Sequence, residues 1–183
     1  MSNPTLQSLH HGEFLELQRR GHWEFVRRRQ GNGGAAFMVA TTPAAELVLV
    51  EQLRLPVERR VIELPAGIVG DEDAGETPLQ AAHRELLEET GYRAGRAAPL
   101  FDAPTTAGLS SEWSWFIRMW ELERVHEGGG VGDEDIRTHV VPLAGIDDFL
   151  AAQRAQGRAV DLRIAAALYW LGGPLDPAAQ GRA

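Results

Sequence analysis

Residues 70–92 constrain the fold and chemistry of this chain more than any other segment of its sequence. Residues 78–90 have the composition of a helix, with Thr77 suited to cap its N-terminus and Pro78 suited to its first turn. Gly91 follows directly, and glycine readily takes the left-handed conformation that ends a helix. The sequence therefore predicts a helix over residues 78–90.

The acidic side chains of this helix gather on one face. Glu85, Glu88 and Glu89 stand at positions i, i+3 and i+4, which project from the same side of an α-helix. Like charges at this spacing repel, and a bound divalent cation would relieve the repulsion. Carboxylate oxygens suit Mg²⁺, and Mn²⁺ can substitute. Arg84 lies among these acids and can orient Glu76 or Glu85. The glutamate spacing alone is more typical of a solvated acidic face, so the surrounding residues must decide.

Those surrounding residues form a longer pattern. Gly-x5-Glu-x7-Arg-Glu-Leu-x-Glu-Glu-x-Gly-Tyr runs from Gly70 to Tyr92 and is matched at every defined position. It resembles the Nudix box, and the chain is identified on this pattern as a member of the Nudix hydrolases. The resemblance implies the Nudix fold, an α/β/α sandwich with a mixed sheet between helices. It also implies metal-dependent attack of water on a diphosphate.

One feature departs from many members of the family, in which the glycine of a Pro-Ala-Gly segment begins the box. Here residues 65–67 form that segment, and the glycine at the box position, Gly70, comes three residues after Gly67. We interpret the difference as an expanded loop before Glu76. Either Gly67 or Gly70 is then the structural equivalent of the first glycine.

The remaining sequence mixes strands and helices without regular βαβ alternation, which predicts an α+β protein. Strands are expected at residues 14–17, 23–28, 37–41, 47–52, 61–64, 97–101, 114–123 and 136–142. Further helices are expected at residues 146–156 and 162–171, the second of which is apolar almost all round and therefore expected to be buried. We divide the chain into a small N-terminal antiparallel β segment, residues 1–34, and a Nudix hydrolase domain, residues 35–183.

Segments outside the box resemble ADP-ribose pyrophosphatases and their nucleotide-sugar relatives. Val-Glu-Gln-Leu-Arg at 50–54 and Glu-Leu-Pro-Ala-Gly at 63–67 are similar to a pair of segments typical of that branch. Residues 106–112 resemble its Ser-Pro-Gly-x-x-x-Glu loop, with Ala107 in place of proline, and residues 22–28 resemble its N-terminal strand. The resemblance implies that the substrate is bound by Trp23, Arg28, Arg54, Glu63 and Glu112.

The chemistry of these side chains suits a nucleoside diphosphate. Trp23 offers a platform for a nucleobase, and a core or interface tryptophan would look the same in sequence. Arg54 and Arg28 suit phosphate groups, although Arg28 also fits a solvated basic run at residues 27–29. Glu112 either supports substrate or metal or is an ordinary loop acid.

The catalytic base has two candidates. Four glycines within residues 128–132 predict a mobile loop, and in related pyrophosphatases a glutamate of this loop moves in to activate water. Glu134 matches that residue, and we expect it to approach the metals only when substrate binds. Glu88 is the alternative base, as in other Nudix branches. The metal ligands implied by the resemblance are Glu85, Glu88, Glu89 and the carbonyl oxygen of Ala66.

Composition narrows the cellular context and the partners. The 183-residue chain has a net charge of −8, which disfavours nucleic acid and anionic membranes because both are bound through clustered Lys and Arg. It contains no cysteine, so disulfides and thiolate metal sites are excluded. No signal peptide and no long apolar run is visible, and a cytoplasmic location is expected.

The function predicted from the sequence is Mg²⁺-dependent hydrolysis of ADP-ribose to AMP and ribose 5-phosphate. A pyrophosphatase for GDP-mannose or another nucleotide sugar is the alternative on the same scaffold. A non-catalytic, nucleotide-sensing Nudix domain is the alternative of another class. The resemblance also implies a homodimer in which residues 14–29 contribute to the partner's substrate site.

Overall fold

The computed structural model describes residues 4–71, 73–132 and 134–172. Its N-terminal strands are β1 (Leu6–His11), β2 (Leu15–Arg20) and β3 (Trp23–Arg28). The body contains β4 (Gly34–Ala40), β5 (Glu46–Arg54), β6 (Arg59–Glu63), β7 (Ala66–Ile68), β8 (Tyr92–Pro104), β9 (Trp113–Arg124), β10 (Arg137–Pro142) and β11 (Ala159–Val160). Its helices are α1 (Pro78–Thr90), α2 (Ile146–Ala155) and α3 (Leu162–Gly172), with short 3₁₀ turns at Leu55–Val57 and Leu143–Gly145.

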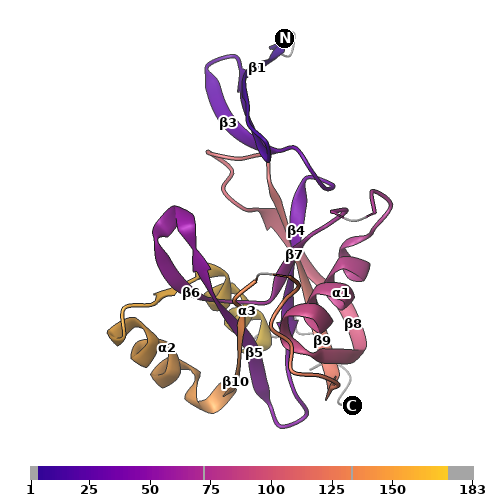
Figure 1. The fold of residues 1–183 in the computed structure, drawn as a ribbon, viewed down its shortest axis with the longest axis vertical. Coiled ribbons are helices and arrows are strands. Elements are labelled where there is room, and N and C mark those ends of the chain that lie inside the picture. Colours follow the sequence, from indigo (N-terminus) through magenta and orange to yellow (C-terminus); the bar gives the residue numbers. More distant parts are fainter. Residues whose placement is uncertain (1–3, 72, 133, 173–183) are drawn as a thin grey trace.

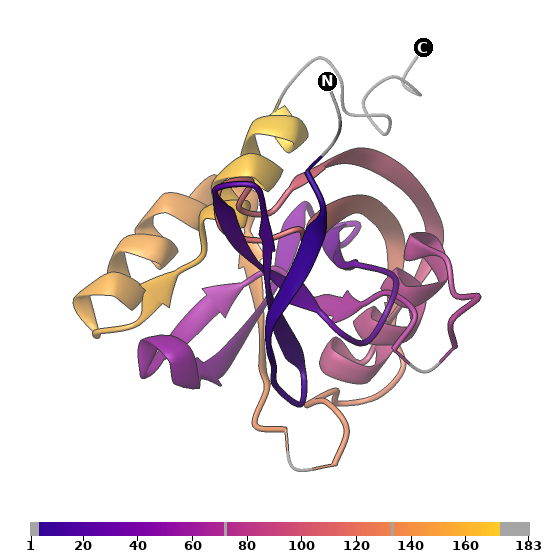
Figure 2. The same ribbon diagram turned by 90° about the horizontal axis from the view of Figure 1, so that it is seen from above.

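Two mixed four-stranded sheets form the body. One has the order β10-β5-β6-β11, in which the β6–β11 pair is parallel, and the other has the order β7-β4-β9-β8, in which the β4–β9 pair is parallel. Helix α1 lies on one side of these strands, and α2 and α3 lie on the opposite side (Figures 1 and 2). The expected α+β fold with mixed strands between helices is confirmed, with the strands divided between two sheets.

Alternate residues of the central strands face two separate cores, because side chains of a strand point to opposite faces. On β4, Met38 packs in the core that contains Leu86 of α1, whereas Val39 packs in the core that contains Ile164 of α3. Both strand residues are fully buried. The apolar side of α1 is thereby fixed to the sheet, which holds the acidic residues of the helix in a defined orientation.

The N-terminal strands form a separate antiparallel sheet that projects from the body (Figure 1). The sequence predicted two strands here, and the structure adds β1, which pairs with β2. All residues of β1 are exposed, so the strand lacks the buried apolar pattern by which sequence analysis finds strands. The sheet joins the body through Val26, which exchanges hydrogen bonds with the main chain of Leu109 and Ser111.

Two further expectations need correction. Helix α3 was expected to be buried all round, yet the side chains of Leu162 and Tyr169 are 77% and 70% exposed, because the helix packs through one face that includes Ile164 and Ala167. Strand β8 extends well beyond the expected residues 97–101, because it pairs with β9 along its whole length. In the described part of the chain, no helix is long and apolar enough to cross a membrane.

Candidate active site

Helix α1 begins and ends where the sequence predicts. The hydroxyl of Thr77 accepts a hydrogen bond from the main-chain N–H of Gln80, and the Gln80 side chain accepts one from the N–H of Thr77. Pro78 occupies the first turn, and Gly91 ends the helix in the left-handed conformation, with φ of 72°. These local contacts fix which residues of the helix face the loop that precedes it.

Gly67 and Gly70 meet two different requirements at that loop. Gly67 lies so close to α1 that a Cβ atom there would be 1.9 Å from the carboxyl group of Glu85. Gly70 has a φ of +78°, and its N–H donates to Oε2 of Glu76 over 3.0 Å. The expanded loop therefore separates the close approach to the helix from the turn that holds Glu76.

Arg84 organises the acidic residues around it. Its Nε atom donates to Oε1 of Glu76 over 3.0 Å. Its Nη1 atom donates to Oε1 of Glu85 over 2.9 Å and to Oε2 of Glu88 over 3.2 Å. Burial alone would raise the pKa of Glu76, but the hydrogen bonds from Arg84 and Gly70 outweigh burial and lower that pKa. The orienting role expected for Arg84 agrees with this geometry.

The pKa values of Glu85 and Glu89 are shifted in the opposite direction, upward. Burial is the main cause that raises the pKa of Glu85 to about 7, and the charges of Glu88 and Glu134 add to it against the opposing effect of Arg84. Burial, followed by the charge of Glu85, raises the pKa of Glu89 to about 8. Glu89 is 5% exposed. Near neutral pH these carboxyl groups therefore retain protons for much of the time.

This donor set suits a divalent cation. A cation would offset the repulsion and favour the ionised carboxylates, and carboxylate oxygens are the ligands that Mg²⁺ prefers. The N–H of Ala66 donates to Oε2 of Glu89 over 3.1 Å, which brings that segment of main chain to the same place. Among the described residues, no three acidic or histidine side chains already surround a common point. Glu85 and Glu88 are instead engaged by Arg84, which a cation would have to displace in part.

A cavity of about 620 Å³ opens beside Ala66 and Gly67. Four of the residues expected to bind substrate line it as two ion pairs. Arg28 Nη2 is 2.7 Å from Glu112 Oε1, and Arg54 Nη2 is 2.6 Å from Glu63 Oε2. The structure thus brings together side chains from β3, β5, β6 and the segment before β9.

A third pair in this cavity was missed by the sequence analysis. Arg163 Nη1 lies 2.6 Å from Asp161 Oδ2, and the guanidinium group stands 4.5 Å from the centre of the Phe37 ring. Asp161 follows the short strand β11, and its N–H donates to the carbonyl oxygen of Ile62. The Asp-x-Arg run is visible in the sequence, but its place beside the cavity depends on the parallel pairing of β11 with β6.

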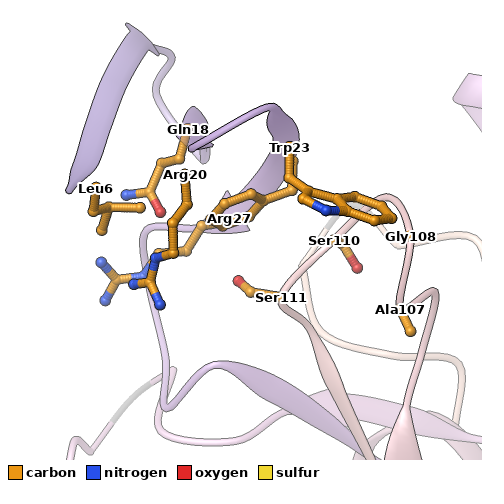
Figure 3. A pocket seen from close by; sticks show the side chains of 10 residues that line it. Leu6, Gln18, Arg20, Trp23, Arg27, Ala107, Gly108, Ser110 and Ser111 are labelled. Atoms are coloured by element: carbon orange, nitrogen blue, oxygen red, sulfur yellow. The ribbon is translucent and has the colours of Figure 1, made fainter. Parts of the chain in front are cut away.

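Trp23 lines a different cavity, of about 550 Å³, between the N-terminal sheet and residues 107–111. Figure 3 shows its ring beside the loop that carries Gly108 and Ser110, whereas Arg20 and Arg27 point toward the opposite end of the same cavity. Trp23 is 56% exposed. Within one chain, the expected aromatic platform therefore stands apart from the cavity that the arginine pairs surround.

The glycine-rich segment before Glu134 is docked on the end of α1. The N–H groups of Gly129 and Gly130 donate to the carbonyl oxygens of Glu89 and Glu88, over 2.8 and 3.1 Å. Both glycines have positive φ, at 115° and 88°, so the segment needs glycine for its conformation. The mobility that the sequence predicts for this segment stays a prediction.

Both candidates for the base lie at this end of the helix. Oε2 of Glu134 accepts a hydrogen bond from the N–H of Val131 over 2.8 Å. Its charge contributes to the raised pKa of both Glu85 and Glu89, so it is within electrostatic reach of both. Glu88 lies on α1 itself. The approach of Glu134 on substrate binding stays a prediction.

Comparison with known proteins identifies the family. The sequence profile of the NUDIX domain matches residues 31–158, and the chain belongs to this family. The GDP-mannose pyrophosphatase of Cronobacter sakazakii is 32% identical over 134 residues, which cover 66% of this chain and 68% of that protein.

The chain is also similar, over shorter stretches, to two other proteins. The methanol dehydrogenase activator of Bacillus methanolicus is 39% identical over 110 residues, and the ADP-ribose pyrophosphatase of Bacillus subtilis is 35% identical over 94 residues. These matches cover 60% and 51% of this chain, and about half of each relative, at 57% and 49%. The crystal structure of an ADP compounds hydrolase has the same fold, with a TM-score of 0.74 at 21% identity over 100% of this chain and 98% of that one.

Proposed function

We propose that this protein hydrolyses the diphosphate bond of a nucleoside diphosphate linked to another group, with ADP-ribose as the preferred substrate. The observation that carries the proposal is the cavity lined by three arginine–carboxylate pairs and by Ala66 and Gly67, because Gly67 in turn lies directly against Glu85 of α1. Its guanidinium groups suit two linked phosphates. The relatives named as pyrophosphatases for ADP-ribose and GDP-mannose support this class of substrate.

Substrate binding would exchange partners around the cavity. Arg28, Arg54 and Arg163 are each paired with a carboxylate, which holds their guanidinium groups in defined positions. Phosphate oxygens compete for the same N–H donors and form comparable charge-assisted bonds. The paired acids, Glu63 and Glu112 among them, would then be free to accept hydrogen bonds from the hydroxyl groups of a sugar.

Glu85, Glu88 and Glu89, with the carbonyl oxygen of Ala66, would hold Mg²⁺ or Mn²⁺. The bound cation would supply charge stabilisation at the diphosphate and a more acidic water. Arg84 keeps the carboxylates of the helix in place while they bind or release charge. These roles use side chains that the described structure already places on one face of α1.

Glu134 is the proposed general base. Its carboxylate takes a proton from the attacking water, whose oxygen forms a bond to one phosphorus while the bridging P–O bond breaks. For ADP-ribose the products are AMP and ribose 5-phosphate. Glu134→Gln should lower kcat with little change in affinity, whereas a larger loss in Glu88→Gln, with Glu134→Gln near normal, would place the base on the helix.

We also propose a homodimer in which residues 14–29 complete the partner's substrate site. The N-terminal sheet leaves six large apolar side chains exposed, namely Leu6, Leu9, Phe14, Leu15, Leu17 and Trp23. A small sheet with so little buried surface is marginal alone. Sedimentation should therefore show a dimer at working concentration, and a fully active monomer would contradict the proposal.

A substrate panel tests the proposed activity. Phosphate release, coupled to a phosphatase, would be measured with Mg²⁺ for ADP-ribose, GDP-mannose, diadenosine polyphosphates and NADH. ADP-ribose should give the highest kcat/KM, and GDP-mannose in first place would favour the second candidate, which the 32%-identical relative supports. Binding without turnover of any compound, with either Mg²⁺ or Mn²⁺, would favour a sensor.

A further inference from the structure

Arg60, on β6, holds the residue that follows the proposed base. Its Nη1 atom is 2.6 Å from Oδ2 of Asp135, and its Nη2 atom donates to the main-chain oxygen of the same residue over 3.2 Å. Its Nε atom donates to Oε1 of Glu51 over 2.5 Å. One planar guanidinium group therefore connects the sheet to the residue next to Glu134.

Glu51, the residue of β5 to which Arg60 is bonded, is buried and makes further ion pairs. The side chain of Glu51 is 1% exposed, and its Oε2 atom lies 3.0 Å from Nε2 of His139 and 3.1 Å from Nε of Arg158. Burial raises the pKa of Glu51, but Arg158, His139 and Arg60 together outweigh burial and lower that pKa. Glu51 is thus a charged, buried anchor for Arg60.

The same segment is fixed at its other end by α1. Gly129 and Gly130 donate to the carbonyl oxygens of Glu89 and Glu88, as described above. Glu134 therefore stands between a docked glycine segment and a residue that Arg60 holds on both its carboxylate and its main chain. Loss of either attachment would free its carboxylate to move relative to the acids of α1.

We propose that Arg60 is a positioning residue, which acts through Asp135 to hold the backbone from which Glu134 approaches Glu85 and Glu89. The inference rests on the proposed role of Glu134 as base. Arg60 is not among the described residues that line the cavity, so its loss should leave substrate binding largely intact. A displacement of about 1 Å can lower a rate by about 100-fold. Arg60→Ala should therefore reduce kcat by roughly 10- to 100-fold, with KM nearly unchanged.

Matched variants separate positioning from general damage. Arg60→Lys keeps the positive charge but loses the planar guanidinium group that bonds to Asp135 and Glu51 at once. Its kcat should therefore lie between those of Arg60→Ala and the native protein. Asp135→Ala alters an exposed side chain and leaves Glu51 paired, so it tests the same attachment without disturbing the buried anchor. Arg137→Ala is the control, because the Nε atom of Arg137 is 3.8 Å from Asp135 Oδ1 and both side chains are exposed; it should retain normal kcat.

Combining Arg60→Ala with Glu134→Gln decides the question, with ADP-ribose and Mg²⁺ as the assay. If Arg60 acts through Glu134, the double variant should be no slower than Glu134→Gln alone. Hydrogen exchange at Gly129 and Val131 in the protein without ligand should also become faster in Asp135→Ala. That readout does not depend on turnover.

Different results would contradict the role of Arg60 and the role of Glu134. A slow Glu134→Gln enzyme combined with a normal Arg60→Ala enzyme, or losses that multiply in the double variant, would overturn the positioning role and leave the proposed function standing. Full activity of Glu134→Gln would instead refute the proposed base, and this inference with it.

Discussion

Helix α1 and the N-terminal sheet present their functional side chains in opposite ways. Arg84 of α1 bonds to Glu85 and Glu88 of the same helix and to Glu76 of the preceding loop, and Glu89 bonds to the main chain of Ala66. On the N-terminal sheet, Trp23 is 56% exposed and lines a cavity of its own. The acidic face is assembled within one chain, whereas Trp23, the proposed aromatic platform, is exposed on the surface.

In the proposed homodimer, this difference would separate the part of the site that depends on association from the part that does not. The acidic face needs only the local caps of α1 and the packing of its apolar side, so it should be intact in a monomer. The N-terminal sheet has exposed apolar residues and contacts the body through Val26 and the Arg28–Glu112 pair. Variants in the two regions should therefore differ in how they depend on protein concentration.

The largest effect is expected on α1. Glu85→Gln or Glu89→Gln should lower turnover by about 1000-fold or more, because each removes a charged ligand while preserving shape. The fold should stay intact, as judged by circular dichroism, and the loss should be the same at every protein concentration. Glu123→Gln, an exposed change on β9, is the matched control and should be normal. Near-normal turnover in either α1 variant would refute the metal assignment.

Much of α1 was predictable because its determinants are local. Thr77, Pro78 and Gly91 determine the ends of the helix through contacts within one helical turn, and Arg84 reaches Glu88 at the i, i+4 spacing of a helix. The fold class followed from the same box together with the mixture of strands and helices. Sequence spacing was informative wherever the helix geometry alone sets the distance between two side chains.

The rest depended on contacts between distant segments. Arg163 reaches the cavity because β11, of two residues, pairs with β6, and no local pattern announces so short a strand. The link from Arg60 to Asp135 spans 75 positions of sequence. The exposure of Tyr169 likewise depends on which face of α3 meets the sheet. Apolar composition predicts burial only when a partner surface covers the whole helix.

A second prediction concerns how the stability of the folded protein without metal depends on Glu89 of α1. Glu89 has its pKa raised from 4.5 to about 8, so between these values the folded state binds more protons than the unfolded state. Stability from this group therefore falls as pH rises through that window, and the cost is fully present above pH 8. Glu89→Gln should raise the unfolding free energy at pH 9 by on the order of a few kcal/mol, and hardly change it near pH 4.

Thermal melts at both pH values, with EDTA and then with Mg²⁺, would measure this effect. Mg²⁺ should stabilise the native protein at pH 9 more than it stabilises Glu89→Gln, because the cation offsets the charge that the variant lacks. A Glu89→Gln variant that is less stable than the native protein at pH 9 without metal would show that ionised Glu89 does not destabilise the folded state.

The smallest effect, and the sharpest test of the contrast between the two regions, is expected at Trp23. Stacking of a base on an aromatic ring contributes about 1–3 kcal/mol, so Trp23→Ala should raise KM by roughly 10-fold or more and leave kcat almost unchanged. The folded state should not lose stability, because the ring is more than half exposed. Trp23→Phe should restore most of the affinity, since it retains an aromatic face.

If Trp23 serves the partner's site, an inactive Glu85→Gln chain with a normal Trp23 should rescue a Trp23→Ala chain when the two are mixed. The mixed dimers would then contain one site with both an intact acidic face and an intact ring, and their KM should be normal. Failure of the mixture to recover a low-KM component, in a dimer shown to exchange chains, would mean that Trp23 serves its own chain or no nucleobase at all.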